Sequence, residues 1–400
     1  MNHSHEEYDV PEELIPKLKE YWKEPCTFSF NSKIKEINDE WVSLKTNYFY
    51  PEGGGQQPDL GYLILKSEQS KKCKIIDVQT RDNETWLKIP KHDLIEGWEV
   101  SAIIDKKRRI SLSRNHSAQH LVSAIFWEEL GFDTTRAEIR EFESQVELDR
   151  SPTLDQISEV NKMITQLIDD KLTIESRYYQ NLDQINLKIR GEMAGMDIYR
   201  LVTIGKYDLN PCGGTHVKNT SEIDSIFINK IESKKVRFLS GNNAKTMYSE
   251  NSVNLIKLSR LTSVPFEKIP ETVEDILNKK NQYEKRIHKL ETQIIEIQNQ
   301  LIHFEDIGNY RIKTYQVPTI TKNAATHVND GLQMNEVVLI VDEQGLFVLS
   351  TGSEKLTMKL IHSLRKLGVK SGGKGKFIMG KLGNLKIKEI KKYMSDLLVI

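Results

Sequence analysis

Cysteine is scarce in this chain: Cys26, Cys73 and Cys212 are the three among 400 residues. They are scattered and odd in number, which argues against the disulfide framework of a small secreted protein and favours a reducing, cytoplasmic compartment. Long apolar runs are missing as well, since none approaches the roughly eighteen residues of a membrane-spanning helix. Residues 1–10 are polar and acidic, unlike a secretory signal peptide. We therefore expect no membrane partner.

An excess of one charge is also absent overall, because 57 basic side chains balance 57 acidic ones. The charges do not balance in every segment, however. Between Lys355 and Lys392 the sequence has twelve Lys or Arg residues and one acid, Glu389. Such a segment fits a phosphate backbone, although a solvated helix face has the same composition. The nucleic-acid candidates are the four lysines near the glycines of this segment: Lys370, Lys374, Lys376 and Lys381.

The length of 400 residues indicates several domains, and the mixture of strand and helix signals indicates an α+β protein. We predict four segments: a small antiparallel β-barrel with a glycine-rich motif over residues 1–105, an α+β sandwich over 106–245, a helical or coiled-coil linker over 246–310, and a basic, glycine-containing α/β domain over 311–400.

The barrel prediction depends on short β-rich runs in the first segment. Residues 27–30 and 41–44 flank the turn signal Asn38-Asp39, which predicts a hairpin. Further strands are expected at 62–65, 74–78 and 85–89, separated by Gly, Pro and Asp. A small antiparallel barrel is the simplest arrangement of such strands.

The second segment mixes helices with strands. A helix is predicted over 120–130, ended by Gly131, and another from the N-cap Thr153, with Gln156 completing a capping box, to about residue 169. Strands are expected at 144–149, 172–178, 198–204, 225–231 and 236–239.

The linker has an apolar seam with alternating steps of three and four residues. Its members are Val273, Ile276, Lys280, Tyr283, Ile287, Leu290, Ile294, Ile297 and Leu301. Lys280 is the one polar member of the seam. The seam fits either a coiled-coil dimer or an intramolecular helical hairpin. In the last segment we predict a strand hairpin, 337–341 and 346–349, followed by a helix over 354–367 that Gly368 ends.

Two short motifs contain the candidate metal-binding residues. His116-Ser-Ala-Gln-His120 and Cys212-Gly-Gly-Thr-His216 each place two metal-binding side chains four residues apart. Three imidazoles and one thiolate favour zinc, and the distance between the motifs means that only the folded chain can assemble the site. Ser117 stands where a zincin metalloprotease has its glutamate, which excludes that class. A purely structural zinc fits the same spacing.

The chain resembles the AlaX-type alanyl-tRNA editing proteins, in a long form whose C-terminal domain is like that of alanyl-tRNA synthetase. Three motifs carry the resemblance over about residues 25–240: Tyr50-Pro-Glu-Gly-Gly-Gly-Gln56, Asn115-His-Ser-Ala-Gln-His-Leu121 and Asn210-Pro-Cys-Gly-Gly-Thr-His-Val217. Ser371-Gly-Gly-Lys-Gly-Lys376 resembles the glycine-rich C-terminal domain less closely. Threonyl-tRNA editing domains share the ligand spacing, but the Gly213-Gly214-Thr215 stretch resembles the alanyl branch.

The resemblance implies a trans-editing enzyme that hydrolyses Ser-tRNA(Ala), and in some members Gly-tRNA(Ala), with one zinc ion per chain held by His116, His120, Cys212 and His216. It also implies dimerisation through the coiled coil and C-terminal domain. For catalysis the sequence offers only candidates, namely Gln56, Glu52 and Thr215. The substrate-binding candidates are Gly53, Gly54, Gly55, Gln56, Thr134, Thr135, Gly213 and Gly214. The two threonines fit serine recognition or a surface turn.

One stretch departs from the family pattern: Arg136-Ala137-Glu138 stands where many relatives have a Gly-Phe-His-like sequence. A catalytically silent, zinc-containing tRNA-binding protein is therefore an alternative, as is an editing domain for another aminoacyl-tRNA such as the threonyl type. A phosphodiesterase is disfavoured because the sequence has no Asp-His-His motif.

Overall fold

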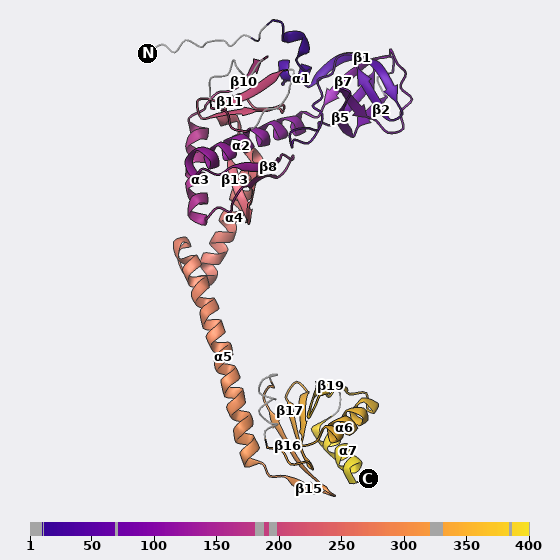
Figure 1. Cartoon of the computed structure of the whole chain (residues 1–400), viewed down its shortest axis with the longest axis vertical. Helices are drawn as coiled ribbons and strands as arrows, with labels where there is room; N and C mark the ends of the chain where they lie inside the picture. The colour runs from indigo at the N-terminus through magenta and orange to yellow at the C-terminus, as the bar shows by residue number, and fades with distance from the viewer. Residues whose placement is uncertain are drawn as a thin grey trace. The chain divides into compact units, whose positions relative to one another are not determined.

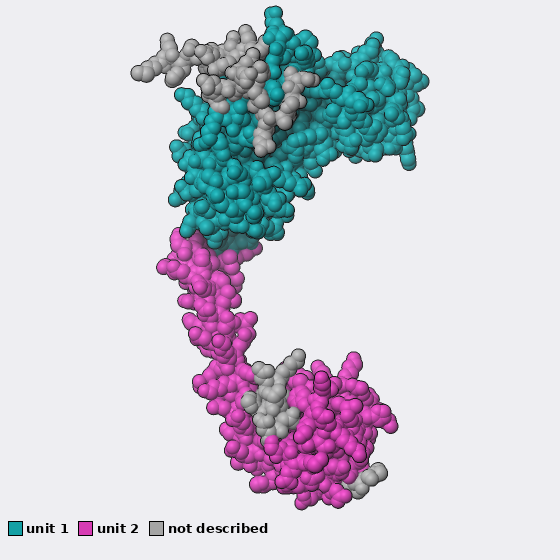
Figure 2. All heavy atoms as spheres, viewed as in Figure 1, with its two compact units in different colours: residues 1–256 teal, residues 257–400 magenta. Residues whose placement is uncertain are grey.

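The chain folds as two compact units, residues 1–256 and 257–400, each described by itself (Figures 1 and 2). The computed structural model describes residues 10, 12–68, 71–180, 188–191, 198–320, 331–383 and 386–399. Most of the polar N-terminal stretch discussed above lies outside these ranges. None of the helices in them is long and apolar enough to cross a membrane.

The first unit begins with a short helix, α1 (Glu20–Lys23), and a 7-stranded sheet in the order β4-β3-β7-β1-β2-β6-β5. The strands are β1 (Ser29–Asn38), β2 (Trp41–Leu44), β3 (Gly61–Leu65), β4 (Lys72–Ile75), β5 (Asp77–Arg81), β6 (Glu84–Lys88) and β7 (Glu99–Ile104). The hairpin of β1 and β2 is confirmed, and Asp39 takes the left-handed conformation of its turn. The predicted strand 74–78 is two strands instead.

The predicted barrel is wrong, because the hydrogen-bonded order is open, with β4 and β5 at its two ends. These strands are consecutive in the chain, but the N–H of Ile76 between them donates to Lys88 O of β6. The sheet curves at β1, whose first half pairs with β7 and whose second half pairs with β2 across a register shift after Ile34. Alternate apolar side chains fill the concave side.

The helix α2 (Lys106–Leu130) leads out of this sheet and forms the centre of the remaining part of the unit. It begins fourteen residues before the predicted start at 120, at the N-cap Asp105, and ends at the predicted Gly131 in the left-handed conformation. The helix α3 (Leu154–Asp169) has the predicted capping box of Thr153 and Gln156. Both helices pack in one apolar core.

Two small sheets complete the first unit. One has the order β10-β11-β12, from β10 (Ile174–Tyr179), β11 (Tyr199–Ile204) and β12 (Asp208–Pro211); the other has the order β13-β14-β9-β8, from β8 (Thr134–Glu138), β9 (Ser144–Leu148), β13 (Ile226–Glu232) and β14 (Lys235–Ser240). Strands β8 and β12 were not predicted from the sequence. The mixed α+β class is confirmed. Helix α4 (Gly241–Thr262) follows β14.

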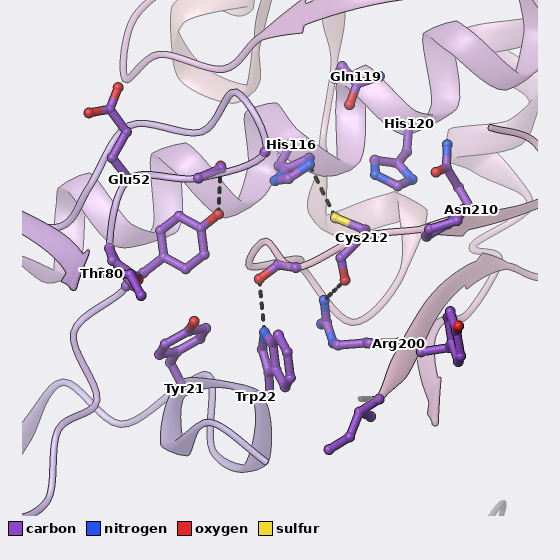
Figure 3. Close-up of a pocket in the computed structure, with 18 residues that line it drawn as sticks. Tyr21, Trp22, Glu52, Thr80, His116, Gln119, His120, Arg200, Asn210 and Cys212 are labelled. Atoms are coloured by element: carbon purple, nitrogen blue, oxygen red, sulfur yellow. Dashed lines mark hydrogen bonds between the residues drawn. The ribbon is translucent and has the colours of Figure 1, made fainter. Parts of the chain in front are cut away.

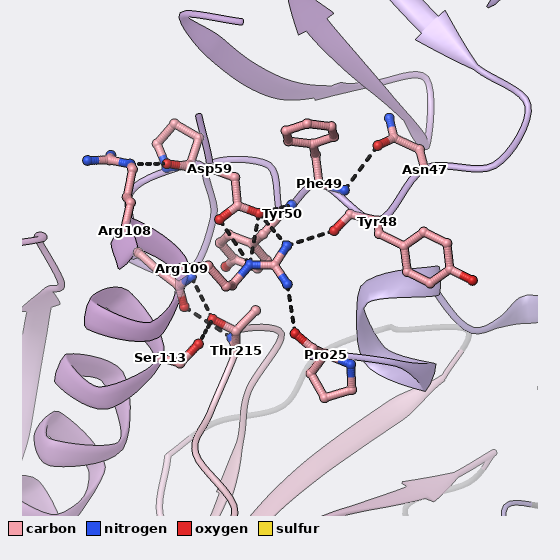
Figure 4. Close-up of polar contacts among 12 residues, drawn as sticks. Pro25, Asn47, Tyr48, Phe49, Tyr50, Asp59, Arg108, Arg109, Ser113 and Thr215 are labelled. Carbon is pink, nitrogen blue, oxygen red and sulfur yellow. Dashed lines mark hydrogen bonds and ion pairs between the residues drawn. The ribbon is translucent and has the colours of Figure 1, made fainter. Parts of the chain in front are cut away.

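A buried ion pair joins α2 to the 7-stranded sheet (Figure 4). Arg109, 1% exposed, pairs through Nε with both carboxylate oxygens of Asp59 at 2.9 Å. Its remaining nitrogens donate to Pro25 O and Tyr48 O, so the charge is fully hydrogen-bonded. This ion pair fixes the start of α2, the helix that carries His116 and His120, relative to the glycine motif at residues 53–55.

The second unit takes in the end of α4 and continues with the long helix α5 (Ile269–Leu301). A 6-stranded sheet in the order β15-β16-β17-β18-β20-β19 follows, from β15 (Glu305–Ile307), β16 (Tyr310–Val317), β17 (Glu336–Asp342), β18 (Leu346–Thr351), β19 (Lys370–Lys374) and β20 (Phe377–Lys381), with helices α6 (Glu354–Lys366) and α7 (Ile387–Val399). The predicted hairpin is β17 and β18, and the predicted helix is α6, ended by Gly368.

Candidate metal centre and pocket

The four predicted metal ligands lie together in the first unit. His116 and His120 project from adjacent turns of α2, and Cys212 and His216 lie on the loop that follows β12. One ligand atom from each side chain lies within 4.8 Å of all the others, and Cys212 Sγ lies 3.4 Å from His116 Nε2 and 3.1 Å from His216 Nε2. Tetrahedral zinc bonds of about 2.0 Å to nitrogen and 2.3 Å to sulfur separate the two atoms by roughly 3.5 Å. The cluster therefore fits a zinc ion.

Each histidine presents its second ring nitrogen to a protein group. His116 Nδ1 lies 2.7 Å from Gln56 Oε1, and His216 Nδ1 lies 3.1 Å from Ser117 Oγ. His120 Nδ1 lies 3.4 Å from the carboxylate of Asp208. Such outer partners fix the tautomer and ring orientation of metal-binding histidines, which leaves Nε2 for the metal.

The carboxylate behind His120 is itself held in place. Arg190 donates to both oxygens of Asp208, through Nε at 2.8 Å and Nη2 at 2.9 Å, and both residues are buried. Burial raises the pKa of Asp208, but the hydrogen bonds from Arg190 and His120 outweigh it and lower this pKa to about 2. The carboxylate therefore remains charged at neutral pH.

The backbone of the Cys212 loop is held from outside by two side chains (Figure 3). Arg200 Nη1 donates to Cys212 O at 2.6 Å and to Gly214 O at 3.0 Å, and Trp22 Nε1 donates to Gly213 O at 2.8 Å. Gly214 has no room for a side chain, because a Cβ atom there would lie 2.1 Å from His116 Cε1. The loop is thus shaped to bring its backbone against the first pair of ligands.

The charges of the cluster suit metal binding. Burial raises the pKa of Cys212, but the three neighbouring imidazoles outweigh this and hold it well below its usual value. Burial also lowers the pKa of His216 to about 3, so its imidazole is neutral at neutral pH. A thiolate beside a neutral imidazole is the protonation state that zinc requires of its ligands.

A cavity of about 550 Å³ opens beside the cluster. The ligands His116, His120 and Cys212 line one side of it. Four aromatic side chains face it from elsewhere: Tyr21 and Trp22 of α1, Tyr50 beside the glycine motif, and Tyr199 of β11. Figure 3 shows Tyr21 and Trp22 across the cavity from the ligands. The site is therefore a candidate metal-binding cluster at the wall of an aromatic pocket.

Some residues of the glycine motif line this pocket and others do not. Gly53, Gly54 and Glu52 line the cavity, together with Gly213 of the second motif. Gly55 instead packs on β8, where a Cβ atom would lie 2.4 Å from Ala137 O. Gln56 is fully buried behind His116.

Thr215 and Gly214 likewise lie behind the pocket wall. The Thr215 hydroxyl accepts hydrogen bonds from Gln56 Nε2 at 3.0 Å and from Ser113 Oγ at 2.8 Å. Of the catalytic candidates, Glu52 is thus a residue of the cavity wall, whereas Gln56 and Thr215 are placed to support the ligands.

The segment that follows α2 lies away from the cavity wall. Thr134 Oγ1 donates to Ser123 Oγ at 2.9 Å, and Thr135 Oγ1 donates to Glu147 O at 3.1 Å. In the departing stretch, Arg136 forms an ion pair with Glu138 at 3.2 Å, and Ala137 packs on Gly55. These side chains therefore do not line the cavity in which a substrate would bind.

The four candidate lysines of the basic segment, Lys370, Lys374, Lys376 and Lys381, lie in the second unit, on or between β19 and β20, and all four are exposed. Lys370 and Lys381 are direct partners across the two strands. Like charges in such positions repel, which a bound anion would relieve. Lysines on the edge strand β19 also block unwanted strand pairing.

Several residues around the cluster were not predicted from the sequence. Asp208, Arg190, Arg200 and Trp22 are each far in sequence from the side chain or carbonyl that they hold, so no local spacing points to the three residues other than Asp208. Asp208 begins the missed strand β12, and an acidic residue four positions before a ligand cysteine was the available clue.

The comparisons with known proteins fit this geometry. The family described as "Threonyl and Alanyl tRNA synthetase second additional domain" matches residues 199–237, and "tRNA synthetases class II (A)" matches residues 20–108. The chain is 29% identical to an alanine--tRNA ligase of Methanococcus aeolicus over 93% of its own length and 42% of that protein. It is 26% identical to one of Pyrococcus abyssi, over 92% and 42% respectively.

An alanine--tRNA ligase of Methanococcus maripaludis is 24% identical over 98% of the chain and 46% of its own length. The chain thus spans less than half the length of these relatives, and over that part it is similar to alanine--tRNA ligases.

Proposed function

We propose that this protein is a trans-editing hydrolase that removes serine from Ser-tRNA(Ala), and glycine from Gly-tRNA(Ala), by zinc-assisted hydrolysis of the ester. The observation that carries the proposal is the convergence of His116, His120, Cys212 and His216 at the wall of a cavity that the glycine motif also lines. The similarity to alanine--tRNA ligases and to a threonyl and alanyl synthetase additional domain supports tRNA(Ala) as the carrier.

Serine and glycine are the expected amino acids for a physical reason. A synthetase pocket for alanine discriminates weakly against glycine, which is smaller, and against serine, which adds one hydroxyl. A second site can accept serine by a hydrogen bond to its hydroxyl. Correct Ala-tRNA(Ala) would then leave that partner unsatisfied and bind less well.

The aromatic side of the cavity suits the terminal adenosine of the tRNA. Single-stranded nucleotides are commonly held by stacking on aromatic rings, and Trp22 and Tyr199 both line the cavity. Arg200 adds a positive charge with its Cζ atom 5.6 Å from the centre of the Trp22 ring. None of the described carboxylates forms an ion pair with it, so the charge can attract the phosphate that precedes the adenosine.

Zinc bound to the cluster would supply a Lewis acid that orients the ester or polarises a water molecule beside it. The chain's own residues prepare the site for this chemistry. Gln56, Asp208 and Ser117 hold the three imidazoles. Arg200 and Trp22 fix the loop that carries Cys212. Glu52 is the candidate proton acceptor, as a carboxylate at the cavity wall.

Binding of the body of the tRNA belongs to the second unit in this proposal. Lys370, Lys374, Lys376 and Lys381 would bind its phosphates. The exposed seam of α5 would pair two chains as a homodimer, which doubles the basic surface available to one assembly.

The decisive experiment is deacylation of Ser-, Gly- and Ala-tRNA(Ala) by the zinc-loaded full chain. We expect Ser-tRNA(Ala) to lose its amino acid fastest, and Ala-tRNA(Ala) at the spontaneous rate. Release at the spontaneous rate from all three would refute the enzyme and favour the silent tRNA-binding alternative. Ser-tRNA(Thr) should be included, because the matched additional domain is shared with threonyl enzymes; its faster hydrolysis would establish the threonyl type instead.

A further inference from the structure

Gln119 is a residue of the cavity wall with no role in the cluster itself. It lies on α2 between the ligands His116 and His120, lines the cavity and is 6% exposed. Figure 3 shows its side chain directed toward the space beside the two imidazoles. A buried amide in this position is expected to have hydrogen-bond partners at both ends.

The nitrogen end of this amide is fixed by a chain of hydroxyl groups. Gln119 Nε2 donates to Ser123 Oγ at 2.9 Å, one turn later on α2. Ser123, which is fully buried, also accepts a hydrogen bond from Thr134 Oγ1 of β8 at 2.9 Å. The orientation of the amide is therefore set from outside the cavity.

The oxygen end has no such partner. Among the residues that the structure describes, none donates a hydrogen bond to Gln119 Oε1, although the side chain is almost wholly buried. With its nitrogen held by Ser123, the amide presents an acceptor at the cavity wall beside the ligand cluster. A small donor bound next to the cluster would complete its hydrogen bonding.

We infer that Gln119 is the specificity-determining residue that recognises the side-chain hydroxyl of serine, by accepting a hydrogen bond from it at Oε1. The inference rests on the proposed function, because it places the aminoacyl group beside the cluster. Alanine and glycine have no donor to offer, and alanine would place a methyl group against an unsatisfied amide.

The position of Thr134 in the sequence fitted direct recognition of serine by its hydroxyl, and the inference gives it an indirect role instead. Thr134 is a positioning residue, because its hydroxyl reaches Gln119 through Ser123 and does not line the cavity. The competing explanation is that water solvates Gln119 Oε1 and that the three side chains only join β8 to α2.

The test uses non-hydrolysable seryl, alanyl and glycyl amides of 3′-amino-3′-deoxyadenosine, with dissociation constants measured on the zinc-loaded full chain by calorimetry. The wild type should bind the seryl analogue most tightly. Gln119→Leu should weaken seryl binding about three- to tenfold, the value of one neutral hydrogen bond, and leave glycyl binding unchanged. Gln166→Leu, the same change on the exposed face of α3, is the matched control.

Thr134→Val provides a second variant that leaves α2 unaltered, and it should reduce the seryl preference in the same direction by a smaller factor. A wild type without seryl preference, or a preference that survives in Gln119→Leu, would overturn the inference. Zinc content, measured in parallel, separates lost recognition from a damaged site.

Deacylation assays then separate the two proposals. Hydrolysis of Ser-tRNA(Ala) that is unaffected by Gln119→Leu would remove the inference and leave the proposed function standing. A seryl preference that depends on Gln119, found without any hydrolysis, would refute the proposed function and leave the binding role of Gln119 standing.

Discussion

Gln56 joins the two halves of the ligand cluster: its Oε1 lies 2.7 Å from Nδ1 of His116 on α2 and accepts the backbone N–H of Thr215, on the second ligand loop, at 3.1 Å. One amide oxygen thereby fixes both the ring of a ligand and the loop that carries two others. Because Oε1 is an acceptor, it selects the tautomer with hydrogen on Nδ1 and leaves Nε2 of His116 free for a metal.

Replacing Gln56 by Leu should therefore weaken zinc binding without removing a ligand. We expect a loss of about 10- to 100-fold in zinc affinity, as for other outer partners of metal-binding histidines. Competition with a chromogenic chelator would measure it. Gln57→Leu is the neighbouring control, since Gln57 accepts from Glu141 N and Arg108 instead. Cys212→Ala should lose zinc outright; unchanged zinc in that variant would disprove the ligand assignment.

The features that the sequence predicted well are those fixed by neighbouring residues. The capping box of Thr153 and Gln156, the turn at Asp39 and the helix end at Gly131 each depend on a few consecutive residues. The four candidate ligands were selected by spacing, since metal chemistry restricts which side chains qualify. Their assembly into one cluster agrees with the prediction from the two motifs.

The features that were missed depend on the rest of the fold. The first half of α2 is buried on several sides, with Arg109, Ser113 and Asn115 inside, so it has no apolar stripe to mark it as a helix. A small barrel was predicted from short strands separated by Gly, Pro and Asp, whereas closure depends on whether the end strands β4 and β5 pair with each other. Arg200 and Trp22 reach the Cys212 loop only through tertiary structure.

Alkaline pH should destabilise the first unit through Tyr21. Burial raises the pKa of this phenol to about 12, against 10.0 for an unperturbed tyrosine. Above pH 10 the unfolded chain loses this proton and the folded chain retains it, so the free energy of unfolding falls as pH rises toward 12. Two pKa units correspond to about 2.7 kcal/mol at most.

Tyr21→Phe should therefore remove part of the stability loss between pH 10 and 12, while the stability at pH 7 changes little. Urea unfolding of both proteins across this range would measure the difference. Parallel curves for the two proteins would contradict the assignment of a raised pKa to this side chain.

The basic segment should control the salt dependence of tRNA binding. Replacing Lys370, Lys374, Lys376 and Lys381 by Gln is expected to weaken binding and to reduce the slope of log K against log salt by roughly one for each phosphate that is no longer neutralised. The control replaces four exposed lysines of the 7-stranded sheet and its loops: Lys45, Lys72, Lys74 and Lys91. Filter binding at several salt concentrations would compare them; equal reductions in both variants would remove the special role of the segment.

The seam of α5 leads to a prediction about assembly. Its eight apolar members are between 37% and 68% exposed in the single chain, which an aqueous helix would not maintain without a partner. If two copies pair along it, Ile287→Glu should place a charge in the interface and raise the dissociation constant by about tenfold or more. Gln282→Glu, on the outer face of the same helix, should leave the dimer intact. Sedimentation equilibrium of the full chain distinguishes the outcomes, and a monomeric wild type would refute pairing.

Charges beside the seam predict the direction of this pairing. Lys279 precedes one seam position and Glu284 follows the next, the g and e′ positions that attract one another between parallel helices. In an antiparallel pair, g positions face g positions, and none of those on α5 (Thr272, Lys279, Arg286, Gln293 and Gln300) is acidic, so Lys279 would find no opposite charge there. Lys279→Glu should therefore weaken the dimer, and adding Glu284→Lys to the same chain should restore it. A double variant no stronger than the single one would exclude the parallel arrangement.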